Sequence, residues 1–321
     1  MSTRPKITAL VSTYHKYAHA QHICDRFLEG YGWNGRHHRP EMDLVSIYVD
    51  QVDEERDVSR ERAERFPLLN IYPSIADALT LGGSDLAVDG ILLIAEHGDY
   101  PVNEKQQTLW PRYEFFQQMA SVFRTTGKSA PVFNDKHLSW SWDYAKTMYD
   151  TSRELGFPFM AGSSLPVTWR TPSLDMPLGA EVEEAMCIAC GWNDGGDLHS
   201  YETIQGMVER RQGGEVGVRC IKAYRGDEFW QAHADGVWSR ELFEACLCRS
   251  HQLAPARPGF NSHFPSIDEM RAKVETPWAY QYEHLDGLKS TMITLNGLVG
   301  DFCFAARLTD RDEPLSTQMY L

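Results

Sequence analysis

Histidine and acidic side chains follow two apolar stretches of this 321-residue chain at spacings that suit metal binding. His15, His19 and His22 recur at intervals of four and three residues, which on a helix would bring their imidazoles to one face. Glu96 and His97 follow a later apolar run and could complete a coordination shell. A bound zinc, manganese or iron ion would polarise a carbonyl or activate water for hydrolysis, aldol cleavage or elimination. The expected ligands are His15, His19, Glu96 and His97; the alternative is that these are ordinary helix-face or capping histidines.

A second group of ionisable residues could move protons without a metal. Asp50 ends one apolar run, and Asp135, Lys136 and His137 directly follow another. A lysine beside other ionisable groups can shift towards its neutral form and then act as a general base or acid. Lys136 is therefore a candidate for proton transfer.

The elements that must position these residues alternate between short apolar runs and helical patterns, which is typical of a parallel sheet built from βαβ units. The pattern predicts a Rossmann-like, doubly wound domain in which ligands bind beyond the carboxyl ends of the strands. The candidate residues all follow strands, so we expect them at that edge. Strands are expected at 6–12, 43–50, 69–72, 89–96, 130–135 and 158–163, and helices at 17–29, 54–66, 74–81, 108–126 and 140–156.

The loop after the first strand lacks the glycines that let a dinucleotide-binding backbone touch a pyrophosphate. Ser12, Tyr14 and Tyr17 stand at the three glycine places, and the two bulky rings should obstruct that approach. Asp50 lies where such domains usually hold a ribose hydroxyl, although a carboxylate in a turn is an equal alternative. The chain thus has the elements of a nucleotide-binding domain, but its first loop lacks the glycines of the nucleotide site.

The regular alternation of apolar runs and helical patterns ends near residue 163. Three prolines follow within twelve residues, Pro166, Pro172 and Pro177, and mark a linker. We expect a Rossmann-like domain over 1–163 and an α+β domain for substrate binding and oligomerisation over 164–321. The second domain should contain a largely antiparallel open sheet, with 251–288 as a long irregular connection. Its strands are expected at 181–191, 215–225, 290–296 and 301–308, and its helices at 198–212 and 239–249.

Charge and hydropathy narrow the expected partners. A formal net charge of −14 argues against nucleic acid and anionic membranes, because both need a positive surface. The expected partner is a small molecule. The sequence has no apolar run of 18 residues and no signal-peptide core, so a soluble cytoplasmic protein is expected.

These motifs, in this order, resemble the glucose–fructose oxidoreductase and inositol dehydrogenase family, often written Gfo/Idh/MocA. The resemblance implies that Lys136 is the family's catalytic lysine, although its neighbours differ from the family's Glu-Lys-Pro motif. It also places His199 at the family's substrate histidine and Glu202 at its trailing acid, while the leading acid of that motif falls at Gly195. The segments that carry the likeness are 49–50, 60–66, 71–79, 88–94, 135–139, 195–202 and 213–218.

The resemblance implies an NAD- or NADP-dependent oxidoreductase that acts on a sugar, polyol or related carbohydrate and forms a homo-oligomer, with a dimer expected. Lys136 and His199 would then handle the proton, facing one shared pocket. The alternatives are a metal-dependent lyase or hydrolase that no longer uses NAD(P), and a non-catalytic small-molecule-binding protein. The residues expected beside a nicotinamide cofactor are Ser12, Tyr14, Asp50 and Glu96.

Overall fold

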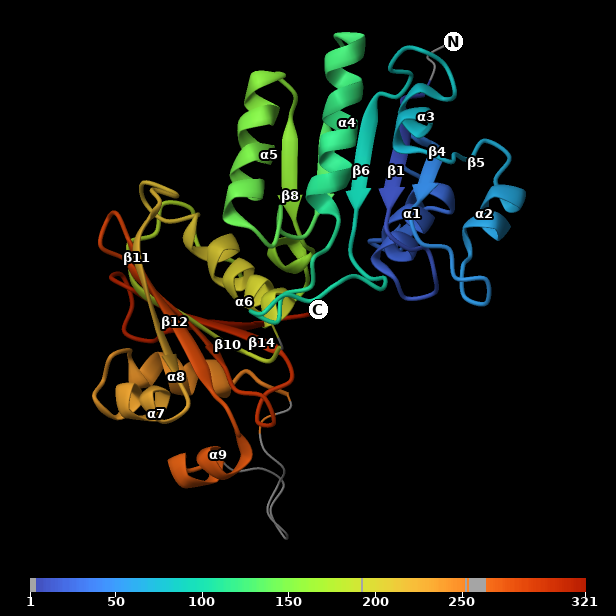
Figure 1. Ribbon diagram of the computed structural model, residues 1–321. Helices are drawn as coiled ribbons and strands as arrows, with labels where there is room; N and C mark the ends of the chain where they lie inside the picture. The colour runs from blue at the N-terminus through green and yellow to red at the C-terminus, as the bar shows by residue number, and fades with distance from the viewer. Residues whose placement is uncertain (1–3, 192, 252, 254–263) are drawn as a thin grey trace. The chain divides into compact units, whose positions relative to one another are not determined.

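The computed structural model describes residues 4–191, 193–251, 253 and 264–321. By its internal contacts the chain divides into two compact units, Met1–Gly162 and Ser163–Leu321 (Figure 1). The predicted boundary between domains lay after residue 163. Each unit has its own sheet and its own hydrophobic core.

The first unit is built on a six-stranded sheet in which all strand pairs are parallel. The strand order is β5-β4-β1-β6-β7-β8, the arrangement of a dinucleotide-binding Rossmann fold. The predicted doubly wound sheet is therefore confirmed. The strands are β1 (Lys6–Val11), β4 (Asp43–Val49), β5 (Asn70–Ile71), β6 (Gly90–Ile94), β7 (Val132–Asp135) and β8 (Phe159–Gly162).

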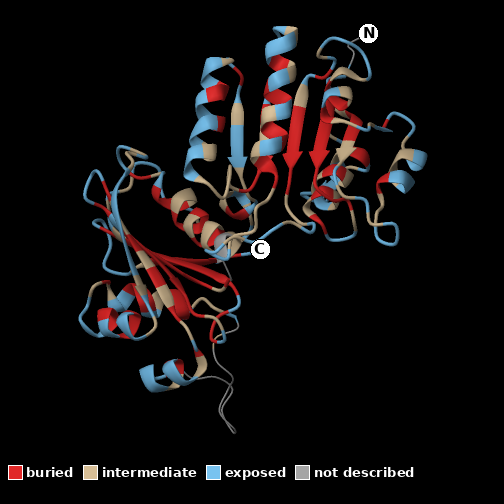
Figure 2. Cartoon of the chain, in the orientation of Figure 1, coloured by how far each residue is buried: buried red, intermediate tan, exposed pale blue. Residues whose placement is uncertain are grey.

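Helices cover both faces of this sheet because its middle strands are apolar on both sides. Strands β1 and β6 are buried, whereas the helices expose their outer faces (Figure 2). One face packs against α1 (His19–Leu28), which α2 (Ser59–Arg65) flanks. The other face packs against α3 (Ile75–Thr80), α4 (Arg112–Thr126) and α5 (Trp142–Glu154). A short hairpin of β2 (Tyr31–Trp33) and β3 (Arg36–His38) lies outside the main sheet.

The second unit contains a seven-stranded mixed sheet of order β11-β12-β13-β10-β14-β15-β9. All of its strand pairs are antiparallel except β10 with β13, which confirms the largely antiparallel prediction. Edge strand β11 is almost wholly exposed, so the sheet stays open on that side. The strands are β9 (Arg170–Thr171), β10 (Val182–Ala189), β11 (Val218–Arg225), β12 (Trp278–His284), β13 (Lys289–Thr294), β14 (Phe302–Leu308) and β15 (Leu315–Met319).

Two sets of helices cover the middle of this second sheet. Helix α6 (Asn193–Val208) and the 3-10 turn η1 (Leu165–Val167) pack on one face. The other face carries α7 (Asp227–Ala234), α8 (Arg240–Leu247) and α9 (Ile267–Lys273), which share a core with the strands. None of the helices in the described part of the chain has both the length and the apolar character that crossing a bilayer requires.

The prediction of an irregular connection over 251–288 was wrong within the described residues. Strand β12 lies inside the sheet between β11 and β13, and α9 begins with a capping box between Ser266 and Glu269. The sequence of β12, Trp-Ala-Tyr-Gln-Tyr-Glu-His, alternates only in part, and its aromatic residues are half-buried. Residues 254–263 of the predicted connection lie outside the described residues.

Candidate functional site

The carboxyl ends of β1 and β6 form the centre of the candidate site. Strand order reverses between them, since β4 follows β1 on one side and β7 follows β6 on the other. Ligands of such sheets bind at this switch point. The Ser12 hydroxyl donates to the carbonyl of Glu96 at 2.8 Å. The loop after β6 also contacts the residue that follows β4 by two. The Gln51 side-chain amide accepts the backbone N–H of Asp99 at 2.8 Å and donates to the Asp99 carbonyl at 2.9 Å.

Three imidazoles meet at this edge. The ring centroid of His97 lies 4.8 Å from that of His19 and 5.9 Å from that of His15, both in edge-to-face geometry. Burial, and then the positive fields of His19, His15 and Lys136, lower the pKa of His97 to about 4 against the opposing effect of Glu96. His97 is therefore neutral at physiological pH. Its Nδ1 is buried without a hydrogen-bond partner among the described residues.

His19 is paired with Asp135, the last residue of β7. Its Nδ1 lies 2.6 Å from Oδ2 of Asp135, which is only 4% exposed. A carboxylate on Nδ1 fixes the tautomer and orientation of an imidazole, so that Nε2 can exchange a proton with a ligand. The pair is therefore arranged for acid–base chemistry.

The loop that carries Asp135 and Lys136 is shaped by one buried side chain. The Asn134 amide nitrogen donates to the carbonyls of Asp135, Lys136 and His137, at 3.3, 3.3 and 3.1 Å. Lys136 is 7% exposed, and its backbone N–H donates to Gly162 at 3.0 Å. The hydrogen bonds from Asn134 thus fix the backbone path by which Lys136 follows β7.

Backbone strain gathers at the same edge. Tyr17, His97 and Lys136 have φ angles of 68°, 72° and 71°, in the left-handed region that side chains rarely adopt. Such conformations cost about 1–3 kcal/mol each and cluster at functional sites. Three of them around one strand switch support a functional role for this edge.

A wholly buried arginine joins the ends of β6 and β7. Arg112, the first residue of α4, is 0% exposed and forms an ion pair with Glu96. Its Nε lies 3.3 Å from the carbonyl of Asp135, and its Nη1 lies 3.4 Å from Nε2 of His137. The guanidinium therefore holds both loops in register.

Of the three residues at the glycine places, only Tyr17 is exposed, at 70%, so its ring alone could obstruct a dinucleotide as expected. Ser12 and Tyr14 are 0% and 1% exposed, so neither side chain faces a ligand. The Tyr14 hydroxyl instead donates to Asp25 at 2.7 Å, inside the domain. Helix α1 begins only at His19, so its N-terminus does not directly follow the strand as a pyrophosphate site requires. The expectation that Tyr14 obstructs the loop was wrong, because its ring points into the core.

The expected ribose acid is also occupied. The carboxylate oxygens of Asp50 accept the hydroxyls of Tyr48 and Tyr100, at 2.7 and 2.8 Å. Burial and the neighbouring carboxylate raise the pKa of Tyr48 to about 12, so its hydroxyl stays a donor. Asp50 is nevertheless exposed, and each of its oxygens keeps a lone pair that a ribose hydroxyl could bond. With Glu96 bound to Arg112, the four expected cofactor contacts are all engaged within the protein.

The structure does not support the metal alternative. No group of three or more His, Cys, Asp or Glu within residues 4–251 and 264–321, apart from the undescribed positions, is arranged to hold an ion. His15 lies in the loop before α1 and forms an isolated bridge with Asp57, so the predicted single helical face of His15, His19 and His22 was wrong. Of the other expected ligands, His19 is bonded to Asp135, while Glu96 is paired with Arg112.

His199 and Glu202 form a separate buried cluster in the second unit. Glu202 accepts the backbone N–H of Ser163 at 2.8 Å and also its hydroxyl, while His199 Nδ1 lies 3.1 Å from that hydroxyl and 3.5 Å from the carboxylate. Burial alone would raise the pKa of Glu202, but hydrogen bonds from His199 and Ser163 lower it below its ordinary value. In a nucleophilic triad the serine and the acid bond different nitrogens of the imidazole, whereas here both Ser163 and Glu202 lie at Nδ1 of His199. The two residues therefore hold the His199 ring in position. The shared pocket of His199 and Lys136 stays a prediction.

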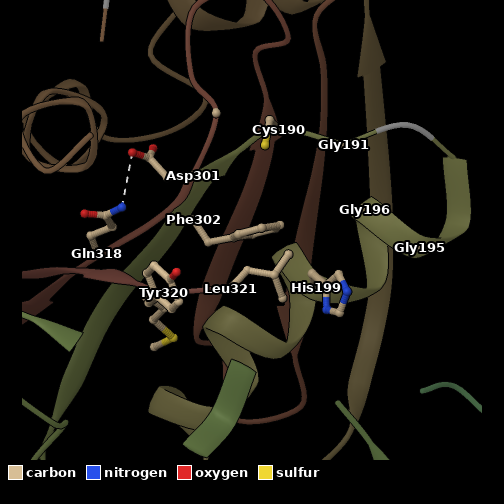
Figure 3. A pocket seen from close by; sticks show the side chains of 12 residues that line it. Cys190, Gly191, Gly195, Gly196, His199, Asp301, Phe302, Gln318, Tyr320 and Leu321 are labelled. Carbon is tan, nitrogen blue, oxygen red and sulfur yellow. Dashed lines mark hydrogen bonds between the residues drawn. The ribbon is translucent and has the colours of Figure 1, made fainter. Parts of the chain in front are cut away.

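His199 also lines a pocket of about 380 Å³ within the second unit (Figure 3). Phe302 stands edge-on to the His199 ring, with centroids 5.8 Å apart. The backbone at the pocket wall is tightly packed, since a Cβ on Gly191 would lie 2.6 Å from the Cα of Gly196. The remaining lining residues are Cys190, Gly195, Gly300, Asp301, Gln318, Met319, Tyr320 and Leu321.

Sequence reasoning did not single out Arg112 or Asn134. Arg112 follows Pro111 at the start of a helix and is separated from its partners by 16 to 25 residues, so no local pattern marks it. Asn134 directly precedes the Asp-Lys-His run, and that position could have marked it.

The comparisons with known proteins show what this chain is similar to. No protein-family model and no curated protein sequence matches it. Among solved structures, GenD2 from gentamicin A biosynthesis in complex with NAD has a TM-score of 0.54 at 13% identity, over 99% of this chain and 73% of that one. Biliverdin reductase from Synechocystis sp. PCC 6803, with biliverdin and NADP+, has a TM-score of 0.52 at 12% identity, over 98% and 80%. Myo-inositol dehydrogenase from Lactobacillus casei, with NAD(H) and myo-inositol, has a TM-score of 0.50 at 11% identity, over 99% and 75%.

The fold is therefore that of the two-domain dehydrogenases of the Gfo/Idh/MocA type, and the resemblance seen in the sequence is confirmed at the level of the fold. All three of these structures contain NAD or NADP, and one of them, the myo-inositol dehydrogenase, also contains a polyol. Fold alone does not carry activity.

Proposed function

We propose that this protein is an enzyme that moves protons on a hydroxylated small molecule of the sugar and polyol class. The observation that carries this proposal is the His19–Asp135 pair at 2.6 Å, set at the strand switch of a Rossmann sheet. Asp135 holds the imidazole so that Nε2 takes or gives the substrate proton. Two structural neighbours support the substrate class: myo-inositol dehydrogenase, solved with myo-inositol, and GenD2 from gentamicin A biosynthesis.

The neighbouring groups suit this role. His97 stays neutral beside His19, so it can donate or accept a hydrogen bond without repelling a protonated partner. Lys136 adds a positive charge at the same edge, which would stabilise negative charge developing on a substrate oxygen. The reaction types open to such a site are enolisation, epimerisation and elimination.

The test uses the purified full chain and a panel of sugars, polyols and their keto derivatives in D2O, followed by proton NMR without nicotinamide. We expect deuterium exchange or product formation with at least one member. His19→Asn and Asp135→Asn should each lower the rate by about 10²-fold or more, the usual contribution of a general acid or base. His37→Asn, in the exposed β2–β3 hairpin, is the matched control.

A nicotinamide-dependent oxidoreductase on the same substrates is the second candidate, favoured by the NAD and NADP complexes of the structural neighbours. It predicts thermal stabilisation by NADH or NADPH, which at a hundred times the dissociation constant amounts to about 2.7 kcal/mol. Turnover that occurs only with added NAD+ or NADP+ would replace the first proposal with the second. Inactivity under both conditions would favour the non-catalytic alternative.

A further inference from the structure

We propose that the outer edge of strand β11 is a docking site for an extended acidic peptide, which adds to the second sheet as a further strand. The site lies in the second unit and does not depend on the proposed function. Strand β11 pairs with β12 on one side and ends the sheet (Figure 1). In such a strand the backbone N–H and C=O groups of alternate residues face outward, where an added strand can bond them.

The length of this edge sets it apart from the other edges of the two large sheets. Strand β11 has eight residues, and all of them except Tyr224 are exposed. The other edge strands are β5 and β9, with two residues each, and β8, with four. Short edges and prolines are common ways to prevent strand pairing, and β11 has neither. Its backbone is therefore open to a partner strand.

The charges on the strand select an acidic partner. Arg219, Lys222 and Arg225 are all exposed, in a chain with a net charge of −14. Arg219 lies 3.4 Å from a carboxylate oxygen of Glu283 on β12, whereas Lys222 and Arg225 form no ion pair with any described residue. A second copy of β11 would bring three more cations against these and be repelled. Carboxylates on an added strand would pair with them.

The two cations without an ion pair define the spacing of the acids. Successive side chains of a strand point to opposite faces, so Lys222 and Arg225, three residues apart, lie on opposite faces of the sheet. An added strand meets both when two of its acidic residues are three positions apart, whichever way the strand runs. Ile221 is 56% exposed and precedes Lys222, so an apolar residue beside one of the acids would cover it. The predicted ligand is an extended segment with acids at i and i+3, flanked by an apolar residue.

The experiment follows the fluorescence anisotropy of a labelled peptide during titration with the purified full chain. The probe is a ten-residue valine–threonine peptide with glutamates at positions 4 and 7. One comparison peptide carries lysines at these positions. The other keeps the glutamates but has prolines at positions 5 and 6, one of which must face β11 without a backbone donor.

We expect saturable binding of the glutamate peptide and at least tenfold weaker binding of both comparison peptides. Because the charges are exposed, binding should weaken as sodium chloride rises from 50 to 500 mM. Amide hydrogen exchange of residues 218–225 should slow when the glutamate peptide is bound, which locates the site.

Charge reversal tests the role of the two cations. Lys222→Glu/Arg225→Glu should bind the glutamate peptide at least tenfold more weakly and should now bind the lysine peptide, which also shows that the variant is folded. The matched control is Arg60→Glu/Arg153→Glu, which makes the same change in net charge at two exposed helical positions of the first unit. This control should bind both peptides as the unaltered chain does.

The proposal is overturned if the glutamate peptide shows no saturable binding, if it binds the charge-reversed variant as well as the unaltered chain, or if hydrogen exchange of 218–225 does not change. Sedimentation equilibrium supplies a further check. A dimer that Lys222→Glu/Arg225→Glu dissociates would also overturn the proposal, since a second copy would then occupy the edge.

Discussion

Replacing Arg112 by methionine should destabilise the first unit strongly. The guanidinium is 0% exposed, and its removal leaves Glu96, whose side chain is 14% exposed, without its ion-pair partner. Breaking a buried pair by deleting one member typically costs about 3–5 kcal/mol. The carbonyl of Asp135 loses a donor as well. For a unit of 162 residues, each kcal/mol corresponds to about 2–4 °C in melting temperature, so we expect a loss of roughly 6–20 °C.

A double-variant cycle separates the charge from the packing. Arg112→Met/Glu96→Leu removes both members of the pair, and such replacements are often neutral, so it should recover at least half of the loss. Arg112→Lys keeps the charge but not the forked geometry, and should fall between the two. Urea unfolding, followed by signals assigned to the first unit, measures all three. A loss below about 1 kcal/mol for Arg112→Met would refute the view that this arginine joins the two loops.

Three further changes test the other buried groups. Because His97 binds fewer protons when folded than when unfolded between its lowered pKa of about 4 and its ordinary 6.5, stability should rise with pH across this window; His97→Asn should flatten that rise in urea titrations. Tyr14→Phe removes a hydrogen bond to the charged Asp25 and should cost about 1.5–3 kcal/mol by chemical unfolding, a cost below 0.5 kcal/mol arguing against that bond. Glu202 has a lowered pKa, so its contribution is present above its ordinary value and lost on acidification; Glu202→Gln should make the second unit less sensitive to acid, as circular dichroism at pH 3 to 6 would show.

The parallel sheet of the first unit could be predicted because its strands are continuous apolar runs that end in polar residues. Strands β1, β4, β6 and β7 lie within the predicted ranges, and the edge that gathers His19, His97 and Lys136 follows from them. Helix and strand periodicity is a local property, so this part of the fold can be predicted from short stretches of sequence.

The rest depends on contacts between distant positions. Strand β12 alternates only in part, and its place between β11 and β13 is set by pairing across the sheet. The expectation for Tyr14 was that its ring obstructs the loop, whereas its hydroxyl donates to Asp25, eleven residues later, and the ring is buried. Arg112 reaches its partners through tertiary structure alone, so the stabilising centre of the candidate site has no signature in any single segment.

The shape of the β7 loop suggests how distant relatives of this protein could be recognised. Asn134 fixes the path of the next three residues, Lys136 included, through their own carbonyls. A search profile built on phosphate-binding glycines would pass over such chains. A profile that asks for Glu-His after one strand, an arginine opening the next helix and Asn-Asp-Lys-His after the following strand would retrieve chains that share this arrangement.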